Sequence, residues 1–331
     1  SAGSNPGPVA YGLGNTRPTV TDANVILGRI DAESPIGGSL ERLDVEAARA
    51  AVMEHVGTAL GLSAEDAAEA IGTVANARMA GAIRLVSIER RFDPKDFALM
   101  PFGGGGALHA CALMMDVGLG RAIVPRYPGV TSAMGCVIAD MRQDFVQTVN
   151  AATAEVDIAG LAALMQEHAD TGHRLLDDSA VAFAGRREVF ELDMAYQGQT
   201  HTVSVELPVV LRDGRVEDLG RAEIQAAFDK TYQALYGRLL PKSATRILNL
   251  RTSVIGLRPK LDLASLAPRA LEAGERPEPR TSRQVHIGGA WRETPIFDRL
   301  ALPSGFLVSG PALLEQPDTK ILIEQGMTGS L

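Results

Sequence analysis

Four consecutive glycines, Gly103, Gly104, Gly105 and Gly106, constrain the fold of this chain more than any other feature of its sequence. The apolar run before them (97–101) predicts a buried strand, and the helix-forming run after them (107–117) predicts a helix. Glycines remove every Cβ atom from the turn, and a helix start offers unpaired N–H groups. The pattern predicts either a close approach to a nucleotide or a tight packing turn, since the fingerprint G-x-G-x-x-G is not satisfied.

The segments around the glycines predict a βαβ unit. Residues 121–125 are apolar and predict the strand that follows the helix, so a parallel pair with a right-handed crossover is expected. Upstream, helices are expected over 44–60 and from Ser63 to about Glu89. Ser63 is a favourable N-cap for the second of these, with Asp66 at the third position after it.

The character of the sequence changes after about residue 180. Residues 188–196 and 200–207 alternate at period two around a QGQ turn, which predicts a β-hairpin. The remaining expected elements are helices at 158–176 and 221–236, a strand at 246–257, an extended linker at 258–283 and short strands over 284–327. We therefore expect an α/β protein in three parts: a nucleotide-binding part (1–150), an α+β region (151–260), and a linker with a small β domain (261–331).

Composition and charge exclude several classes of protein. The 331 residues are 46% hydrophobic and 22% charged, which is typical of a globular chain long enough for two domains. A net charge of −8 without a basic block argues against nucleic acid as a partner. The sequence shows no membrane span and no signal peptide at its start. Cys111 and Cys136 are too few for a disulfide scaffold, and we expect buried, reduced thiols in a cytoplasmic protein.

Asp22 and Asn24, in the segment PTVTDAN, are the candidate catalytic pair. One interpretation is helix capping, because Thr21 or Asp22 is a favourable N-cap for the run that follows. The other is a carboxylate that faces the active cleft, where it holds metal-bound water or orients substrate. The two are compatible, because an N-cap faces whatever binds at that end of the helix.

Three further residues are candidates for binding. His109, just after the glycines, is either a packed core histidine or a polar contact to nucleotide. Arg126 and Tyr127 precede Pro128-Gly129, a turn signal. The other histidines make no metal-ligand spacing, so the metal ligands are left open. The patterns G-x-S-x-G, H-E-x-x-H and C-x-x-C are absent from the sequence.

Several blocks of this sequence, in the expected order, resemble the hydantoinase A and 5-oxoprolinase family. They are SAGSNPGPVAYG (1–12), PTVTDANVILGRI (18–30), FGGGGALHACAL (102–113), VPRYPGVTSAMGCVIADMRQDF (124–145), YQGQTH (196–201), LYGRLLP (235–241) and SGPALLEQPDTKILIEQGM (309–327). The family usually has alanine and proline inside the glycine loop, where this chain has Gly105 and Ala107. Family members are also about twice this long, and their N-terminal half carries a GVDVGGTFTD-like phosphate loop and a second glycine-rich loop that are not present here.

The resemblance implies a fold, a ligand and partners. Residues 1–150 would complete an actin-like nucleotide-binding domain, in which the glycine turn, with His109, binds the adenosine side of ATP. The loop of Arg126 and Tyr127 would lie near the cleft or a partner subunit. The implied cofactors are ATP and Mg²⁺ (or Mn²⁺). The implied partners are a hydantoinase B-type subunit and a polypeptide that carries the phosphate-loop half.

The resemblance also implies an activity, the ATP-dependent opening of a cyclic amide such as a hydantoin or 5-oxoproline. ATP would phosphorylate the amide oxygen and make a better electrophile, with Mg²⁺ bridging the phosphates. A related alternative is a subunit of an ATP-dependent acetone or acetophenone carboxylase. An alternative of another class is a non-catalytic subunit that contributes a nucleotide lid and a docking surface.

Overall fold

The computed structural model describes residues 5–37, 40–212, 215–217 and 219–331. Its contacts group the chain into two compact units. The first unit joins residues 1–135 with 262–331, and the second comprises 136–261. The three-part division at 150 and 260 stays a prediction about domains, but its first and last parts contribute to one compact unit.

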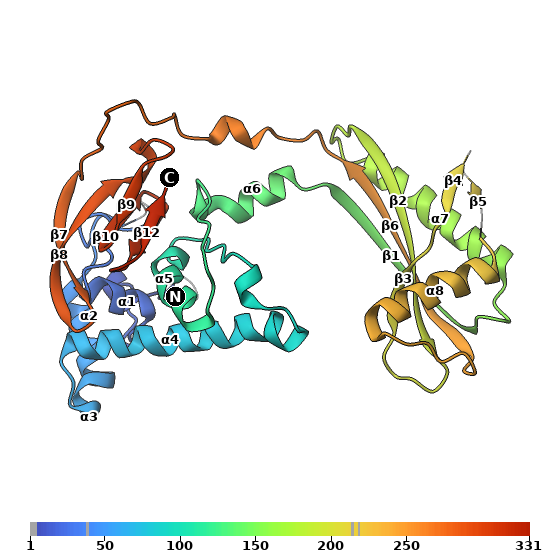
Figure 1. Cartoon of the computed structure of the whole chain (residues 1–331), viewed down its shortest axis with the longest axis horizontal. Coiled ribbons are helices and arrows are strands. Elements are labelled where there is room, and N and C mark those ends of the chain that lie inside the picture. Colours follow the sequence, from blue (N-terminus) through green and yellow to red (C-terminus); the bar gives the residue numbers. More distant parts are fainter. Residues whose placement is uncertain (1–4, 38–39, 213–214, 218) are drawn as a thin grey trace. The chain divides into compact units, whose positions relative to one another are not determined.

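Helices make up most of the N-terminal part of the first unit (Figure 1). The α4 helix (Ala64–Val86) is long and packs against α1 (Val20–Ile26) and α5 (Ala110–Val117). Ser63 caps α4 by accepting the amide of Asp66, as expected. The helix expected over 44–60 is present with one π-helical turn, and its parts are α2 (Val45–Val52), η2 (Met53–Gly57) and α3 (Thr58–Leu60). The short 3₁₀ turns of this part are η1 (Val9–Tyr11), η3 (Ile88–Arg90), η4 (Pro94–Asp96), η5 (Gly106–His109) and η6 (Pro128–Val130).

A C-terminal sheet completes the core of the first unit. Its strands follow the order β11-β10-β8-β7, in which β10 and β8 are parallel and the other pairs antiparallel. Leu313 and Leu322 face a core that they share with Ile26 and Leu27 of the N-terminal part, so the β module and the helices stabilise each other. The strands are β7 (Thr281–Ile287), β8 (Ala290–Asp298), β10 (Ala312–Gln316), β11 (Thr319–Ile323), and a separate pair of β9 (Leu307–Ser309) with β12 (Thr328–Ser330).

The strands expected on either side of the glycine turn are wrong over most of their length. Their pairing is reduced to one parallel bridge, between Leu99 and Ala122. Within the described residues, neither segment forms a strand of a sheet. A pair of short segments is not stable as a sheet without further strands beside it. The helix expected over 107–117 begins as the 3₁₀ turn η5 and continues as α5.

The second unit is an antiparallel sheet with helices on one face (Figure 1). The strand order is β1-β6-β2-β3, and the expected hairpin is confirmed as the β2–β3 pair. Apolar side chains of the sheet pack against the helices, whereas the opposite face carries paired charges such as Asp193 with Arg251. The elements are β1 (Met141–Ala152), α7 (Ile158–Asp177), β2 (Gly185–Tyr196), β3 (Val203–Glu206), β4 (Val210–Arg212), β5 (Arg215–Glu217), α8 (Arg221–Tyr236) and β6 (Thr245–Leu257).

Both units combine helices with β-sheets, which confirms the α/β prediction at this level. Assignment to the actin-like superfamily stays a prediction. The α6 helix (Thr131–Ile138) spans the division between the units, and η7 (Leu263–Leu266) and η8 (Arg299–Ala301) lie in the C-terminal segment. In the part of the chain that the structure describes, no helix has both the length and the apolar character needed to cross a bilayer.

Candidate functional site

A cavity of about 460 Å³ in the first unit gathers several residues that the sequence singled out. Asn24, the turn glycines Gly104 to Gly106, and His109 all line it. A volume of this size lies in the range of small-molecule sites. The other lining residues are Tyr11, Val20, Thr21, Ile30, Pro35, Ile36, Leu43, Ala75, Met79 and Leu108.

The glycine turn requires glycine at two positions for different reasons. Gly103 has φ +82°, a left-handed conformation in which side chains are strained. A Cβ atom on Gly104 would lie 3.0 Å from Cγ2 of Ile36, so this residue is packed closely against the cavity wall. Gly105, in contrast, has no atom within 4 Å of the position of its missing Cβ atom. A methyl group there would therefore enter open space at the cavity.

His109 offers a hydrogen-bond acceptor from a buried ring. Its Nδ1 lies 2.7 Å from Oδ1 of Asn76 on α4. An amide oxygen only accepts, so Nδ1 carries the proton and Nε2 keeps a lone pair. Nε2 has no hydrogen-bond partner among the described residues. Burial, together with the positive charge of Arg29, lowers the pKa of His109, which favours this neutral form.

Asp22 is fully buried and occupied by backbone donors. Its carboxylate accepts the amides of Val9 at 3.2 Å, Ala10 at 2.8 Å and Thr19 at 2.7 Å, and also the Thr19 hydroxyl at 2.8 Å. The expected N-cap at Thr21 or Asp22 is wrong: Thr19 is the N-cap, and Asp22, the third residue of the helix, completes the capping box. These contacts attach the N-terminal loop to α1, and a catalytic role of Asp22 stays a prediction.

Asn24 lies one turn further along α1 and does reach the cavity. Its Nδ2 donates to the carbonyl oxygen of Val20 at 3.1 Å. Its Oδ1 has no partner among the described residues, so Asn24 and His109 each present one free acceptor. The structure thus separates the expected pair. Asn24 lines the cavity, whereas the carboxylate of Asp22 accepts hydrogen bonds from the backbone amides of Val9, Ala10 and Thr19.

Arg126 and Tyr127 are outside the cavity but belong to a loop that supports it. The carbonyl oxygen of Pro128, the next residue, accepts the amide of Gly103 at 2.7 Å. The backbone of this loop is fixed by Arg299, which donates to the carbonyl oxygens of Val124 and Arg126. Burial lowers the pKa of Arg299 to about 10, so the guanidinium stays charged at neutral pH. These contacts hold the loop of Arg126 and Tyr127 beside the glycine turn.

Sequence reasoning missed the residues that hold the turn from the C-terminal sheet. Asp318 accepts the amide of Gly129 at 2.8 Å, and the Thr319 hydroxyl donates to the carbonyl oxygen of Gly104 at 3.0 Å. Asn76, the partner of His109, was also missed. The contact partners of these polar residues are far away in the sequence, so the sequence around each of them gives no signal for its contact.

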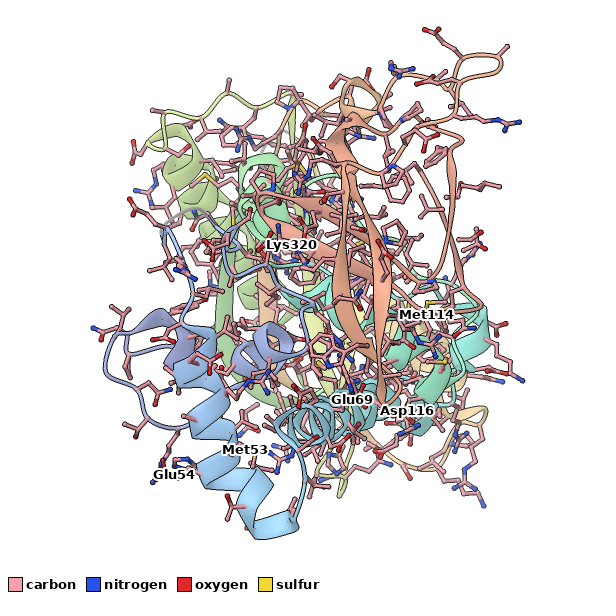
Figure 2. All side chains as sticks on the ribbon, turned by 90° about the vertical axis from the view of Figure 1, so that its left-hand side faces the viewer. Met53, Glu54, Glu69, Met114, Asp116 and Lys320 are labelled. Atoms are coloured by element: carbon pink, nitrogen blue, oxygen red, sulfur yellow. The ribbon has the colours of Figure 1, made fainter. Side chains whose placement is uncertain are left out.

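Glu69, on α4 in the same unit (Figure 2), has charged residues as neighbours. Oε1 of Glu69 is 3.0 Å from Nδ1 of His286. Burial lowers the pKa of Arg29, against the opposing effect of the Glu69 carboxylate, and burial raises the pKa of Glu324. The described residues contain no group of three His, Cys, Asp or Glu side chains suited to a metal ion.

A larger cavity, of about 610 Å³, lies beside Cys111 and Met114 of α5. Cys111 donates its thiol hydrogen to the carbonyl oxygen of Leu322, and burial raises the pKa of the thiol. A thiol in this state is a poor nucleophile. We therefore place the candidate site at the 460 Å³ cavity, where the free polar atoms and the glycine turn converge.

Family comparisons match both parts of the chain. Residues 1–145 match the model described as "Hydantoinase/oxoprolinase". Residues 177–331 match "Hydantoinase/oxoprolinase C-terminal domain". The chain belongs to the hydantoinase/oxoprolinase family.

Relatives within the hydantoinase/oxoprolinase family extend beyond this chain. It is 34% identical to the caprolactamase subunit alpha of Pseudomonas jessenii over 339 residues, a match that covers 100% of this chain and 47% of the relative. The crystal structure of the ATP-dependent caprolactamase from that organism superposes with a TM-score of 0.70 at 33% identity, covering 100% of this chain and 48% of that one. The acetophenone carboxylase gamma subunit of Aromatoleum aromaticum is 29% identical, with 98% of this chain and 44% of the relative covered. The chain thus spans about half the length of these relatives.

Proposed function

We propose that this chain supplies the adenosine side of the ATP site in an enzyme complex that opens cyclic amides. The observation that carries the proposal is the convergence of Asn24, Gly104 to Gly106 and His109 on one cavity. A similar protein, the caprolactamase of Pseudomonas jessenii, is described as ATP-dependent, and a caprolactam is a cyclic amide. Family membership supports a hydrolase that works as part of a complex.

The cavity suits the base and ribose of a nucleotide better than its phosphates. Its walls are mainly apolar, and beside the hydroxyls of Tyr11 and Thr21 they carry two acceptors without a partner among the described residues, Oδ1 of Asn24 and Nε2 of His109. Such acceptors suit the exocyclic amine of adenine or a ribose hydroxyl, and they would repel phosphate oxygens. The phosphates would then be held by the polypeptide that carries the phosphate loops, and Mg²⁺ or Mn²⁺ would bind with them and offset their charge.

Phosphorylation explains why such a reaction uses ATP. An amide carbonyl is a poor electrophile because of its resonance, and a phosphorylated carbonyl oxygen is a better leaving group. The residues of this chain would position the nucleotide, while a hydantoinase B-type subunit completes hydrolysis. Positioning alone contributes strongly to phosphoryl transfer, because the chemistry depends on in-line geometry.

Carboxylation of a ketone is the second candidate, because the acetophenone carboxylase gamma subunit matches 98% of this chain. The two reactions share ATP and differ in the acceptor. In the assembled complex, ATP hydrolysis that depends on a lactam or hydantoin supports the first candidate. Hydrolysis that depends on both a ketone and bicarbonate supports the second.

Titration with adenosine and with ADP tests the proposed site directly. Because the chain supplies the base and ribose side, we expect both ligands to bind with similar affinity. Gly105→Ala places a methyl group in the open space at the cavity and is expected to weaken both by about tenfold, or about 1.4 kcal/mol.

Gly81→Ala is the matched control for Gly105→Ala. Gly81 also has open space at its Cβ position, but it is a residue of α4 that does not line the cavity. Unchanged affinity is expected for this variant. Binding of ADP without binding of adenosine would contradict the assignment of the cavity to the base and ribose.

A further inference from the structure

A further cavity lies within the second unit, at the end of the sheet where β1 and β2 finish and β6 begins. Its volume of about 410 Å³ is in the range of small-molecule sites. Two of the sequence blocks meet there, because Tyr196 is the first residue of YQGQTH and residues 239–241 are the last of LYGRLLP. The amide of Leu240 donates to the hydroxyl oxygen of Tyr196 at 3.0 Å, so the two blocks are joined at the cavity.

A row of hydrogen-bonded side chains in this cavity fixes the orientation of Gln225. Oγ1 of Thr245 lies 2.9 Å from Oγ1 of Thr153 and 2.7 Å from Oε1 of Gln225. An amide oxygen only accepts, so Thr245 donates to Gln225 and Thr153 donates to Thr245. Nε2 of Gln225 donates in turn to Oδ1 of Asp229 at 2.8 Å. One carboxylate oxygen of Asp229 is thereby used, and the other has no partner among the described residues.

Arg221 adds a positive charge to the same cavity. Its guanidinium donates to the carbonyl oxygen of Val156 at 2.8 Å, which holds the side chain in place. Arg221, Gln225 and Asp229 follow one another at intervals of four residues on α8, so they share one side of the helix. At about 1.5 Å of rise per residue, the backbones of Arg221 and Asp229 are about 12 Å apart. Neither residue forms an ion pair with another described residue, so the cavity presents a cation and an anion at separate positions.

Apolar residues complete the walls. Leu239, Leu240 and Pro241 line the cavity from the loop that follows α8. The hydroxyl hydrogen of Tyr196 has no acceptor among the described residues, so it is a further donor for a ligand. The cavity thus suits a molecule with a carboxylate at one end, an ammonium group at the other and a hydrocarbon chain between them.

We propose that this cavity binds an ω-amino acid, with its carboxylate at Arg221 and its ammonium group at Asp229. Hydrolysis of a lactam breaks the ring C–N bond and leaves a carboxylate and an amine on one molecule, so such a ligand is a product of the reaction proposed above. Its identification as a product rests on the proposed function, whereas the site rests on the contacts within the second unit. The nucleotide cavity belongs to the first unit, so the two sites are separate.

Calorimetric titration of the chain with three six-carbon probes tests this site. The probes are 6-aminohexanoate, hexanoate and hexylamine, of which only the first carries both charges. We expect 6-aminohexanoate to bind at least about tenfold more tightly than either of the others, because both of its charges are then paired. Asp229→Asn keeps an acceptor for Gln225 and should weaken 6-aminohexanoate about tenfold without weakening hexanoate. Arg221→Gln should weaken 6-aminohexanoate by a similar factor without weakening hexylamine.

Glu223→Gln and Lys230→Gln are the matched controls, because each removes one charge from an exposed position of α8 that does not line the cavity. Neither should change the affinities. Equal affinity for 6-aminohexanoate and hexanoate, or unchanged affinity in a folded Asp229→Asn variant, would overturn the proposal. The titration uses neither ATP nor a lactam and concerns the second unit, so its failure and a failed adenosine titration are independent results.

Discussion

The hydroxyl of Thr319 donates to the carbonyl oxygen of Gly104 over 3.0 Å, joining residues that are 215 positions apart in the sequence. Thr319 begins β11 and is fully buried, so the C-terminal sheet fixes the glycine turn directly. The conformation at the cavity therefore depends on the C-terminal part of the chain as much as on the glycines.

Replacing the Thr319 hydroxyl should loosen the glycine turn. Thr319→Val keeps the shape of the side chain and leaves a carbonyl oxygen without its donor, which is expected to cost about 1–2 kcal/mol of unfolding free energy. Adenosine binding is expected to weaken as well. Thr328→Val, at an exposed position on β12, is the control and should change neither quantity in urea unfolding and ligand titration.

The carboxylate of Asp22 should matter for stability. Asp22→Asn replaces one acceptor oxygen by a donor amide that faces backbone N–H groups, so we expect a loss of about 2–3 kcal/mol in urea unfolding of the first unit. Asp44→Asn is the matched control, because Asp44 caps α2 and asparagine caps equally well. A stable Asp22→Asn variant that abolished turnover in the assembled complex would instead support a catalytic role.

The stability of the first unit should depend on the ionisation of His109. Because its pKa is lowered from the ordinary value of 6.5, the unfolded chain binds a proton that the folded chain does not. Stability is therefore full above about pH 6.5 and falls as the pH drops toward the lower pKa of the folded state. His109→Gln should remove this part of the pH dependence.

Ring nitrogen chemical shifts check the same assignment. We expect a protonated Nδ1 and an unprotonated Nε2 at pH 7, and Asn76→Ala should remove this preference because it removes the acceptor. A folded-state pKa at or above 6.5 would contradict the prediction.

Gly172, on α7, should be intolerant of a side chain despite its helical backbone. A Cβ atom there would collide with Cγ2 of Val254 on β6, so Gly172→Ala is expected to destabilise the second unit by about 1–3 kcal/mol. Val254→Ala should recover part of this loss in the double variant. Gly81→Ala, in open space on α4, should instead be neutral or stabilising in thermal unfolding.

Local signals in the sequence predicted local structure well. Ser63 and Asp66 begin α4 as expected, and Gly237 ends α8 in the left-handed conformation that glycine favours. The alternating pattern before Tyr196 predicted the hairpin, because side chains at period two must face a core on one side. These features depend on neighbours a few residues away.

Long-range contacts were not predictable in the same way. Two partners of Asp22, Val9 and Ala10, lie in η1, 13 and 12 residues upstream. The partners of His109 and Gly104 are 33 and 215 residues away. No periodicity encodes such pairs. The strand near Leu99 was predicted from its apolar run, but a strand forms only where a neighbour supplies the hydrogen bonds, and the described chain supplies a single bridge.

The shared core of Ile26 and Leu27 with Leu313 and Leu322 has a consequence for the order of folding. During synthesis α1 emerges long before the C-terminal sheet against which it packs. Its apolar face therefore stays exposed while about 290 further residues are made. The second unit, whose residues 136–261 are contiguous, can fold in the meantime. Residues 136–261 can therefore reach their folded state before the core around Ile26 and Leu27 is closed.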